Sequence, residues 1–348
     1  MQKKKFKDYV QEYMMILVLI LLLIVFEVLC LVMTNRNFLG ISNIMNILGQ
    51  NAYLIIVGIG ITFIMLGGAM DLSTGYLLST VGVVMALIDN GDVAGKGNST
   101  FFLLTLIVGL ALAVVLSGFN GLMYSWLAVF PFVITLASQY IFNGATYLVA
   151  GGQQHTYKNL SPWFSYLGGT SINWLGGLKT GVLVMIAMVI IGSIILNKTH
   201  FGRNVYALGS NPDAVALSGV SVAKMRLAVF ALAGLFFGIA QVVNIGRMSG
   251  SASQSMGIGA EFTVMAGAML GGVKMGGGGG KMSNMVVGVL IIAVLNQGMN
   301  FLNINPYWQK VALGVVLLAA VILDTLQTRA AINAAKKVSG KPPKEAAA

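Results

Sequence analysis

The sequence predicts an all-α polytopic membrane protein with about ten transmembrane helices, some of them broken or half-length. Of its 348 residues, 57% are hydrophobic and only 9% are charged, and the mean hydropathy is +0.85. Long apolar segments recur along the chain, and the positive charges gather at their ends. This composition excludes a soluble domain. The net charge of +11 is explained by membrane topology rather than by nucleic acid, because no basic patch interleaved with aromatic residues is present.

The first apolar segment, residues 14–33, follows a lysine-rich start and superficially imitates a secretory signal. It is too long for one, because about 20 apolar residues match the ~30 Å hydrocarbon core of a bilayer. The polar stretch from Thr34 to Asn37 is not a small-residue cleavage site. We therefore expect a retained anchor, preceded by a cytoplasmic N-terminal segment at residues 1–13.

Nine further apolar segments complete the predicted set of ten. They lie at 44–66, 72–88, 101–118, 132–150, 180–196, 227–246, 262–273, 285–303 and 311–323. If the odd-numbered segments run outward, most of the 21 Lys and Arg residues fall on the inner side, as the positive-inside rule requires. Both termini then face the cytoplasm. We expect one transmembrane domain at 14–329 and a basic, disordered cytoplasmic tail at 330–348.

Two glycine breaks interrupt this pattern. The segment at 262–273 is shorter than the ~17 residues needed to cross a bilayer, which predicts a half-helix or a broken helix. Gly67-Gly68 predicts a second break, and irregular backbone at membrane depth must be enclosed by protein or line a watery cavity. The string Met-Leu-Gly-Gly occurs at both breaks, at 65–68 and 269–272, a hint of duplication that is too short to establish one.

One polar loop, residues 197–226, separates two spans and contains a short helix with signals at both ends. Asn211 suits the N-cap, Pro212 the first helical position, and Asp213 the positive end of the helix dipole. Gly219 supplies a left-handed stop. The helix between them carries small apolar side chains, including Ala214, Ala216 and Leu217. This small face favours docking to a cytoplasmic protein over lying on lipid headgroups, which usually requires more aromatic and basic residues.

Reactive side chains are sparse. One cysteine, Cys30, and two histidines, His155 and His200, predict neither a metal site nor a catalytic centre. The run Gly276 to Gly280 before Lys281 lacks the first glycine and the Ser or Thr of a phosphate loop, so we interpret it as a flexible cytoplasmic turn.

Polar residues within the spans suggest either a hydrophilic path or contacts between helices. Asp71 is better placed to cap a helix at the break than to contact cargo, since Ser73 and Thr74 follow it. A neutral polyol needs hydrogen-bonding groups along its route, whereas the alternative is that amides bond neighbouring helices and aromatics pack the bundle. The candidates for a translocation path are Asn51, Asn120, Phe132, Asn143, Asn296 and Asn300.

Four blocks of sequence resemble the sugar-type ABC importer permeases, the ribose and galactose class of membrane subunits. They are GGAMDLSTG at 67–75, the PFVITLAS block at 131–152, the loop FGRNVYALGSNPDAVALSGVSVAKMR within 201–234, and the block containing NPYWQ at 288–324. The resemblance covers nearly the whole chain in the right order. Four blocks in register are a strong signal, although each alone is modestly specific.

The resemblance implies a transport subunit rather than an enzyme, in a bacterial cytoplasmic (inner) membrane. Two permease subunits, identical or different, would form a pathway for a small neutral carbohydrate. ABC ATPase subunits would bind ATP and Mg on their own chains, so this chain needs no cofactor, and an extracytoplasmic solute-binding protein would deliver the sugar. The resemblance makes 197–226 the coupling loop, whose helix contacts the ATPase. Its residues are Gly209, Asn211, Pro212, Asp213, Ala214, Ala216, Leu217 and Gly219.

Three alternatives remain at this point. An ion-coupled secondary carrier or channel would need an intramembrane charge relay, and only Glu27 and Asp71 come close to one. A membrane enzyme is disfavoured by the lack of clustered His, Cys or paired carboxylates. An ABC permease for branched-chain amino acids is the nearest confusable relative, although the NPYWQ block favours the sugar branch.

Overall fold

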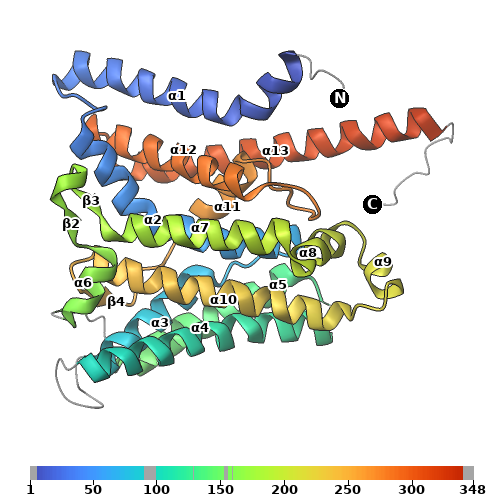
Figure 1. Cartoon of the computed structure of the whole chain (residues 1–348), viewed down its shortest axis with the longest axis horizontal. Helices are drawn as coiled ribbons and strands as arrows, with labels where there is room; N and C mark the ends of the chain where they lie inside the picture. The colour runs from blue at the N-terminus through green and yellow to red at the C-terminus, as the bar shows by residue number, and fades with distance from the viewer. Residues whose placement is uncertain (1–5, 90–98, 128, 153–155, 159, 340–348) are drawn as a thin grey trace.

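The computed structural model describes residues 6–89, 99–127, 129–152, 156–158 and 160–339, which form a bundle of helices (Figure 1). The helices are α1 (Phe6–Thr34), α2 (Ile41–Leu66), α3 (Thr74–Asp89), α4 (Ser99–Leu127), α5 (Pro131–Val149), α6 (Pro162–Gly168), α7 (Thr180–Lys198), α8 (His200–Ser210), α9 (Pro212–Leu217), α10 (Val222–Arg247), α11 (Ala260–Leu270), α12 (Met282–Phe301) and α13 (Pro306–Ser339). Two antiparallel pairs of two-residue strands join β1 (Thr156–Tyr157) to β4 (Ala252–Ser253) and β2 (Ser171–Ile172) to β3 (Leu178–Lys179).

Among the described residues, seven helices are long and apolar enough to cross a membrane, and three shorter apolar helices accompany them. The three are α3, α11 and the Pro306–Ile322 part of α13. Together they match the ten predicted segments, so the prediction of an all-α polytopic membrane protein is confirmed. The half-length segment is α11, which has 11 residues.

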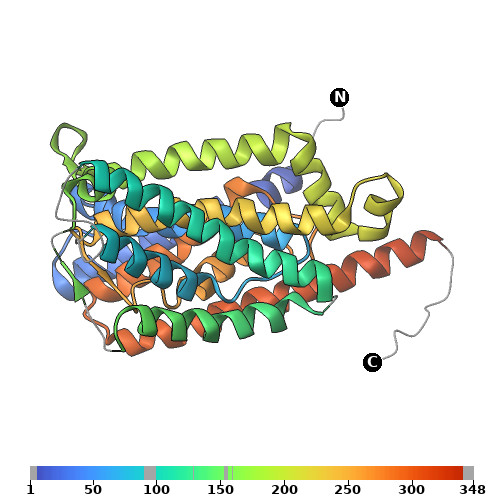
Figure 2. The ribbon, with the colours of Figure 1, turned by 90° about the horizontal axis from the view of Figure 1, so that it is seen from below.

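The helices run along the long axis of the bundle, and the two ends of the bundle differ (Figure 1). The short helix α6 and the strands lie at one end, whereas α8 and α9 lie at the other, where α1 begins and α13 ends. Turned by 90°, the bundle shows α13 running past its neighbours at the α9 end (Figure 2). Because α1 begins and α13 ends at the same end of the bundle as α9, the arrangement is consistent with ten segments that alternate in direction, as the charges predict.

The centre of the bundle is formed by α2 and α10. In the most apolar stretch of each helix, 78% of the residues of α2 and 72% of those of α10 are buried, against 11% for α1 at the periphery. Close packing at the centre requires small residues: a side chain at Gly60 of α2 would meet the Phe237 ring of α10 at 2.6 Å. The exposed apolar face of α1, by contrast, suits contact with lipid.

The two Met-Leu-Gly-Gly strings end α2 and α11 in the same way. Gly67 and Gly271 continue the helix at φ −74° and −66°, and Gly68 and Gly272 then turn left-handed at φ +81° and +80°. In both turns the next amide reaches back five residues, Ala69 N to Ile64 O at 3.1 Å and Val273 N to Ala268 O at 2.9 Å. This is the Schellman geometry, for which glycine is suited because it adopts positive φ without strain.

Two expectations are corrected. The loop 197–226 contains two helices rather than one, because Thr199 caps α8 and the apolar face of α8 packs on the bundle. The tail was expected to be disordered from Ala330, but α13 continues as far as Ser339. The alanine-rich sequence favours helix, and no glycine or proline lies between Ala330 and Gly340. Residues 340–348 of that tail, and residues 1–5 of the expected N-terminal segment, lie outside the described residues.

Candidate functional site

The helix α9 is fixed by short-range interactions at both ends. Its N-cap is Asn211, whose Oδ1 accepts a hydrogen bond from Ala214 N at 3.1 Å, and Pro212 opens the first turn. At the other end, Gly219 adopts φ +83° and Val220 N donates to Val215 O at 3.3 Å. Asp213 lies in the first turn, where its charge complements the helix dipole.

Nearly all of α9 is exposed and points away from the helix bundle. Val215 is its single buried residue at 3% exposure and anchors it to the bundle. Leu217 is 89% exposed, and Ala214 and Ala216 are exposed beside it. An apolar leucine at the tip of a well-capped helix is a feature that a protein partner can cover.

We expect Asn211→Ala to loosen α9 without moving the spans. Removing the capping oxygen costs about 1 kcal/mol, whereas Asn211→Asp keeps an oxygen at the same place and serves as the control. Hydrogen exchange followed by mass spectrometry should show faster exchange of the peptide containing Ala214 and Val215 in Asn211→Ala only. Equal exchange in both variants would contradict this account of the cap.

The helix α8 is the platform beneath α9. Its buried side includes Val205 and Leu208, and the Phe201 ring lies 6.2 Å from the Phe63 ring of α2. Tyr206 Oη donates a hydrogen bond to Gly280 O at 2.8 Å, which ties α8 to the loop between α11 and α12. Gly209, one of the residues predicted for contact with an ATPase, lies against the backbone of Leu66 and of Gly277 and Gly278.

The break after α2 holds a buried polar network. Asp71, only 1% exposed, accepts hydrogen bonds at Oδ1 from Ser73 N at 2.8 Å and from Ser73 Oγ at 2.6 Å. Asn120 of α4 donates to Ser73 Oγ at 2.8 Å and accepts from Ser138 Oγ of α5 at 2.6 Å. The network joins the start of α3 to α4 and α5, and the bond from Ser73 N to Asp71 Oδ1 forms an Asx turn just before α3.

A second buried acid, Glu261, was missed by the sequence reasoning. It stands at the start of α11, is 1% exposed, and its carboxylate lies so close to Gly75 that any side chain at Gly75 would overlap it. The last glycine of the GGAMDLSTG block is therefore required by packing. A signal was available, because Glu261 directly precedes the apolar segment expected from 262 and falls in the first turn of a helix.

Within the part of the chain that the structure describes, no three His, Cys, Asp or Glu side chains come together in a way that would hold a metal ion.

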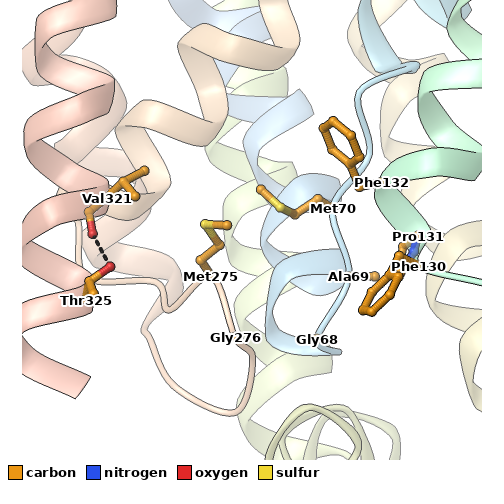
Figure 3. Close-up of a pocket in the computed structure, with 10 residues that line it drawn as sticks. All are labelled: Gly68, Ala69, Met70, Phe130, Pro131, Phe132, Met275, Gly276, Val321 and Thr325. Atoms are coloured by element: carbon orange, nitrogen blue, oxygen red, sulfur yellow. Dashed lines mark hydrogen bonds between the residues drawn. The ribbon is translucent and has the colours of Figure 1, made fainter. Parts of the chain in front are cut away.

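A cavity of about 430 Å³ opens near the α9 end of the bundle (Figure 3). The turn after α2 and the loop before α12 lie in the centre of the view, between the middle of α13 on the left and the start of α5 on the right. Its lining residues are Gly68, Ala69, Met70, Phe130, Pro131, Phe132, Met275, Gly276, Val321 and Thr325. The lining is mostly apolar, with flexible methionines and phenylalanine rings that can repack.

The six residues predicted for a translocation path do not converge on this cavity. Only Phe132 lines it. Asn120 is fully buried in the Asp71 network, the Asn51 side chain donates to Ile47 O at 2.7 Å, and Asn300 accepts a hydrogen bond from Gln309 at 2.5 Å. The remaining two, Asn143 and Asn296, are half-buried, and Asn296 Oδ1 has no hydrogen-bond partner.

Comparisons with known proteins give the chain a family. The family described as "Branched-chain amino acid transport system / permease component" matches residues 43–321. The galactose/methyl galactoside import permease of Escherichia coli (strain K12) is 30% identical over 94% of this chain and 98% of its own length. The ribose import permease of Bacillus subtilis (strain 168) is 32% identical over 83% of this chain and 87% of its own. No solved structure matches the chain.

A third relative, the D-allose transport system permease of Escherichia coli (strain K12), is 32% identical over 84% of this chain and 86% of its own. The resemblance to sugar-type ABC importer permeases is thereby confirmed, and such permeases are transport subunits rather than enzymes. The chain belongs to this family of multi-pass transport permeases.

Proposed function

We propose that the chain forms the translocation pathway of an ATP-driven importer for a small neutral carbohydrate, a pentose, hexose or related polyol. The observation that carries this proposal is α9, an exposed apolar helix fixed by caps at both ends and held to the bundle by Val215. The relatives that import galactose, ribose or allose support a sugar as the cargo.

In this proposal α9 inserts into a cleft of an ABC ATPase subunit in the cytoplasm. ATP and Mg bind to that partner. A second permease subunit, identical or different, completes the pathway, and a solute-binding protein delivers the sugar at the opposite end, where α6 and the strands lie. The membrane is the bacterial cytoplasmic (inner) membrane, with both termini on the cytoplasmic side with α9.

ATP-driven closure of the ATPases would bias a bundle with two access states. A partner can shift such an equilibrium only by its different affinity for the two states. Because α9 is short, rigid and exposed, it is suited to carry that difference from the ATPase to the spans.

An ion-coupled carrier is the second candidate, and the buried acids Asp71 and Glu261 are the observation that favours it. Both carboxylates lie in the first turn of a helix or directly before it, where the helix dipole stabilises an anion. Asp71 Oδ1 accepts two hydrogen bonds from Ser73, whereas Asp71 Oδ2 and Glu261 Oε2 have no hydrogen-bond partner among the described residues. Uptake driven by an ion gradient is therefore the measurement that decides between the two candidates.

Reconstitution into liposomes tests the proposal. The chain should be assembled with ABC ATPase subunits and a solute-binding protein of the same organism and given labelled pentoses, hexoses, cyclitols and, as a comparison, leucine. We expect one of the sugars to accumulate in the liposomes. This accumulation should require ATP on the side of the membrane where the ATPase subunits lie and the binding protein on the opposite side. Accumulation by the chain alone without nucleotide would establish the carrier, and ATP-dependent uptake of leucine alone would establish the amino acid permease.

A further inference from the structure

We propose that Gly209 fastens α9 to the wall of the cavity of about 430 Å³ near the α9 end, which we call the inner cavity, so that a displacement of α9 changes the width of that cavity. Three segments would move as one body: the end of α2, the helix α8, and the loop between α11 and α12. They meet at what we call the glycine junction, formed by Gly68, Gly209, Gly277 and Gly278. This inference rests on the proposed function, because it assigns the route by which the ATPase acts on the spans.

The glycine junction is a contact of backbone on backbone. A Cβ atom built at Gly277 would lie 2.7 Å from Gly209 Cα and 2.8 Å from Gly68 Cα. One built at Gly209 would overlap Leu66 O and lie 2.6 Å from Gly278 N. Since real Cβ atoms do not approach other atoms this closely, only glycine permits the three segments to meet.

Hydrogen bonds hold the same three segments together. Gly278 N donates to Leu66 O, the last residue of α2, at 2.9 Å. Tyr206 of α8 donates to Gly280 O at 2.8 Å, and Lys274 N donates to Gly279 O at 2.8 Å within the loop. The glycine run, interpreted from the sequence as a flexible turn, thus bonds α8 to α2.

The connection from α9 to the bundle is shorter on the α8 side than on the α10 side. On the α8 side, Gly209 and Ser210 directly precede the N-cap Asn211, which alone separates α8 from α9. On the α10 side, residues 218–221 separate α9 from α10. A displacement of α9 is therefore transmitted through α8 and the junction more directly than through α10.

The junction carries part of the lining of the inner cavity. Gly68, Ala69 and Met70 follow α2, and Met275 and Gly276 belong to the glycine loop (Figure 3). The rest of the lining comes from α5 and α13, which contribute no residue to the junction. If the junction shifts relative to these two helices, the cavity widens or narrows, as in a shear movement between packed elements.

The first test is Gly209→Ala, with Gly314→Ala as the matched control, because a Cβ at Gly314 of α13 meets nothing within 4 Å. Each variant should be purified with its ATPase subunits and assayed in liposomes with the binding protein and labelled ribose, galactose and allose. We expect Gly209→Ala to retain the ATPase subunits, because the exposed face of α9 is unchanged. Its uptake per ATP hydrolysed should fall at least tenfold, and that of Gly314→Ala should stay within twofold of the wild type. Wild-type coupling in Gly209→Ala would overturn the inference.

The second test keeps Gly209 and so does not depend on that variant folding. Tyr206→Phe keeps the ring and removes the hydroxyl that donates to Gly280 O, so it loosens the glycine loop from α8 without changing any glycine of the junction. Tyr140→Phe is the matched control, because Tyr140 is exposed on α5. We expect Tyr206→Phe to retain the ATPase subunits and to lower uptake per ATP hydrolysed at least threefold, and Tyr140→Phe to stay within twofold of the wild type. Equal coupling in the two variants would contradict the inference.

The outcomes separate this inference from the proposed function. If the wild-type complex accumulates none of the sugars tested, the proposed function fails. If the wild type transports sugar and Gly209→Ala does so equally well, only the glycine junction is rejected.

Discussion

Replacing Ala216 with tryptophan is expected to separate the ATPase from the permease and to abolish sugar uptake while leaving the bundle folded. Ala216 is exposed on α9, beside the 89% exposed Leu217, and contributes nothing to the buried core of the chain. A cleft that accepts a helix of small side chains cannot also accept an indole ring. Losing the central contacts of such an interface costs about 2 kcal/mol or more, which corresponds to roughly a thirtyfold loss of affinity.

The measurement is co-purification of the ATPase subunits, followed by uptake in liposomes. Ala111→Trp is a suitable control, because Ala111 is exposed on α4, within a span and away from α9. We expect the control to retain both the ATPase and uptake. Normal uptake with Ala216→Trp would remove α9 from the mechanism, whereas loss of folded protein in both variants would point to a general intolerance of tryptophan.

The sequence predicted α9 well because its signals are local. An N-cap, a proline at the first position and a glycine after the last turn act within a few residues, so Asn211, Pro212 and Gly219 bound the helix without reference to the rest of the fold. The spans were found for a similar reason, since the hydrocarbon thickness sets their length.

The helix α8 was not predicted because its stability comes from tertiary contacts. Its sequence is polar enough to read as loop, and its helical state depends on burying Val205 and Leu208 against the bundle. The residues next to Asn211 in the sequence indicate that it caps a helix. The residues next to Val205 do not indicate whether its side chain packs against the bundle.

The polar path stays a prediction, because residue type does not reveal which way a side chain points. Asn120 was a candidate for contact with cargo, yet it is fully buried and bonded to Ser73 and Ser138. The glycine run at 276–280 was likewise uninformative by itself. Its contacts with Gly68 and Gly209 join segments far apart in the sequence, and such contacts follow only from the fold.

The second large effect is expected at Asp71, where two substitutions distinguish a structural cap from an ion-coupling group. Asp71→Ala removes the acceptor of both Ser73 hydrogen bonds in a buried site, which costs about 1–3 kcal/mol for each donor left unpaired. We expect this variant to unfold at a clearly lower temperature in detergent and to lose most uptake. Asp71→Asn keeps an oxygen that can accept the same bonds, so we expect it to retain folding and a substantial part of uptake.

A transported ion would give a different result for the same pair. An ion-coupling carboxylate acts through its charge, so Asp71→Asn would then be as inactive as Asp71→Ala, although it folds. Uptake by the wild type would also follow an imposed proton or sodium gradient in the absence of ATP. Because Asp71 Oδ1 already accepts two hydrogen bonds from Ser73 in the turn before α3, we expect uptake in Asp71→Asn to follow ATP rather than either gradient.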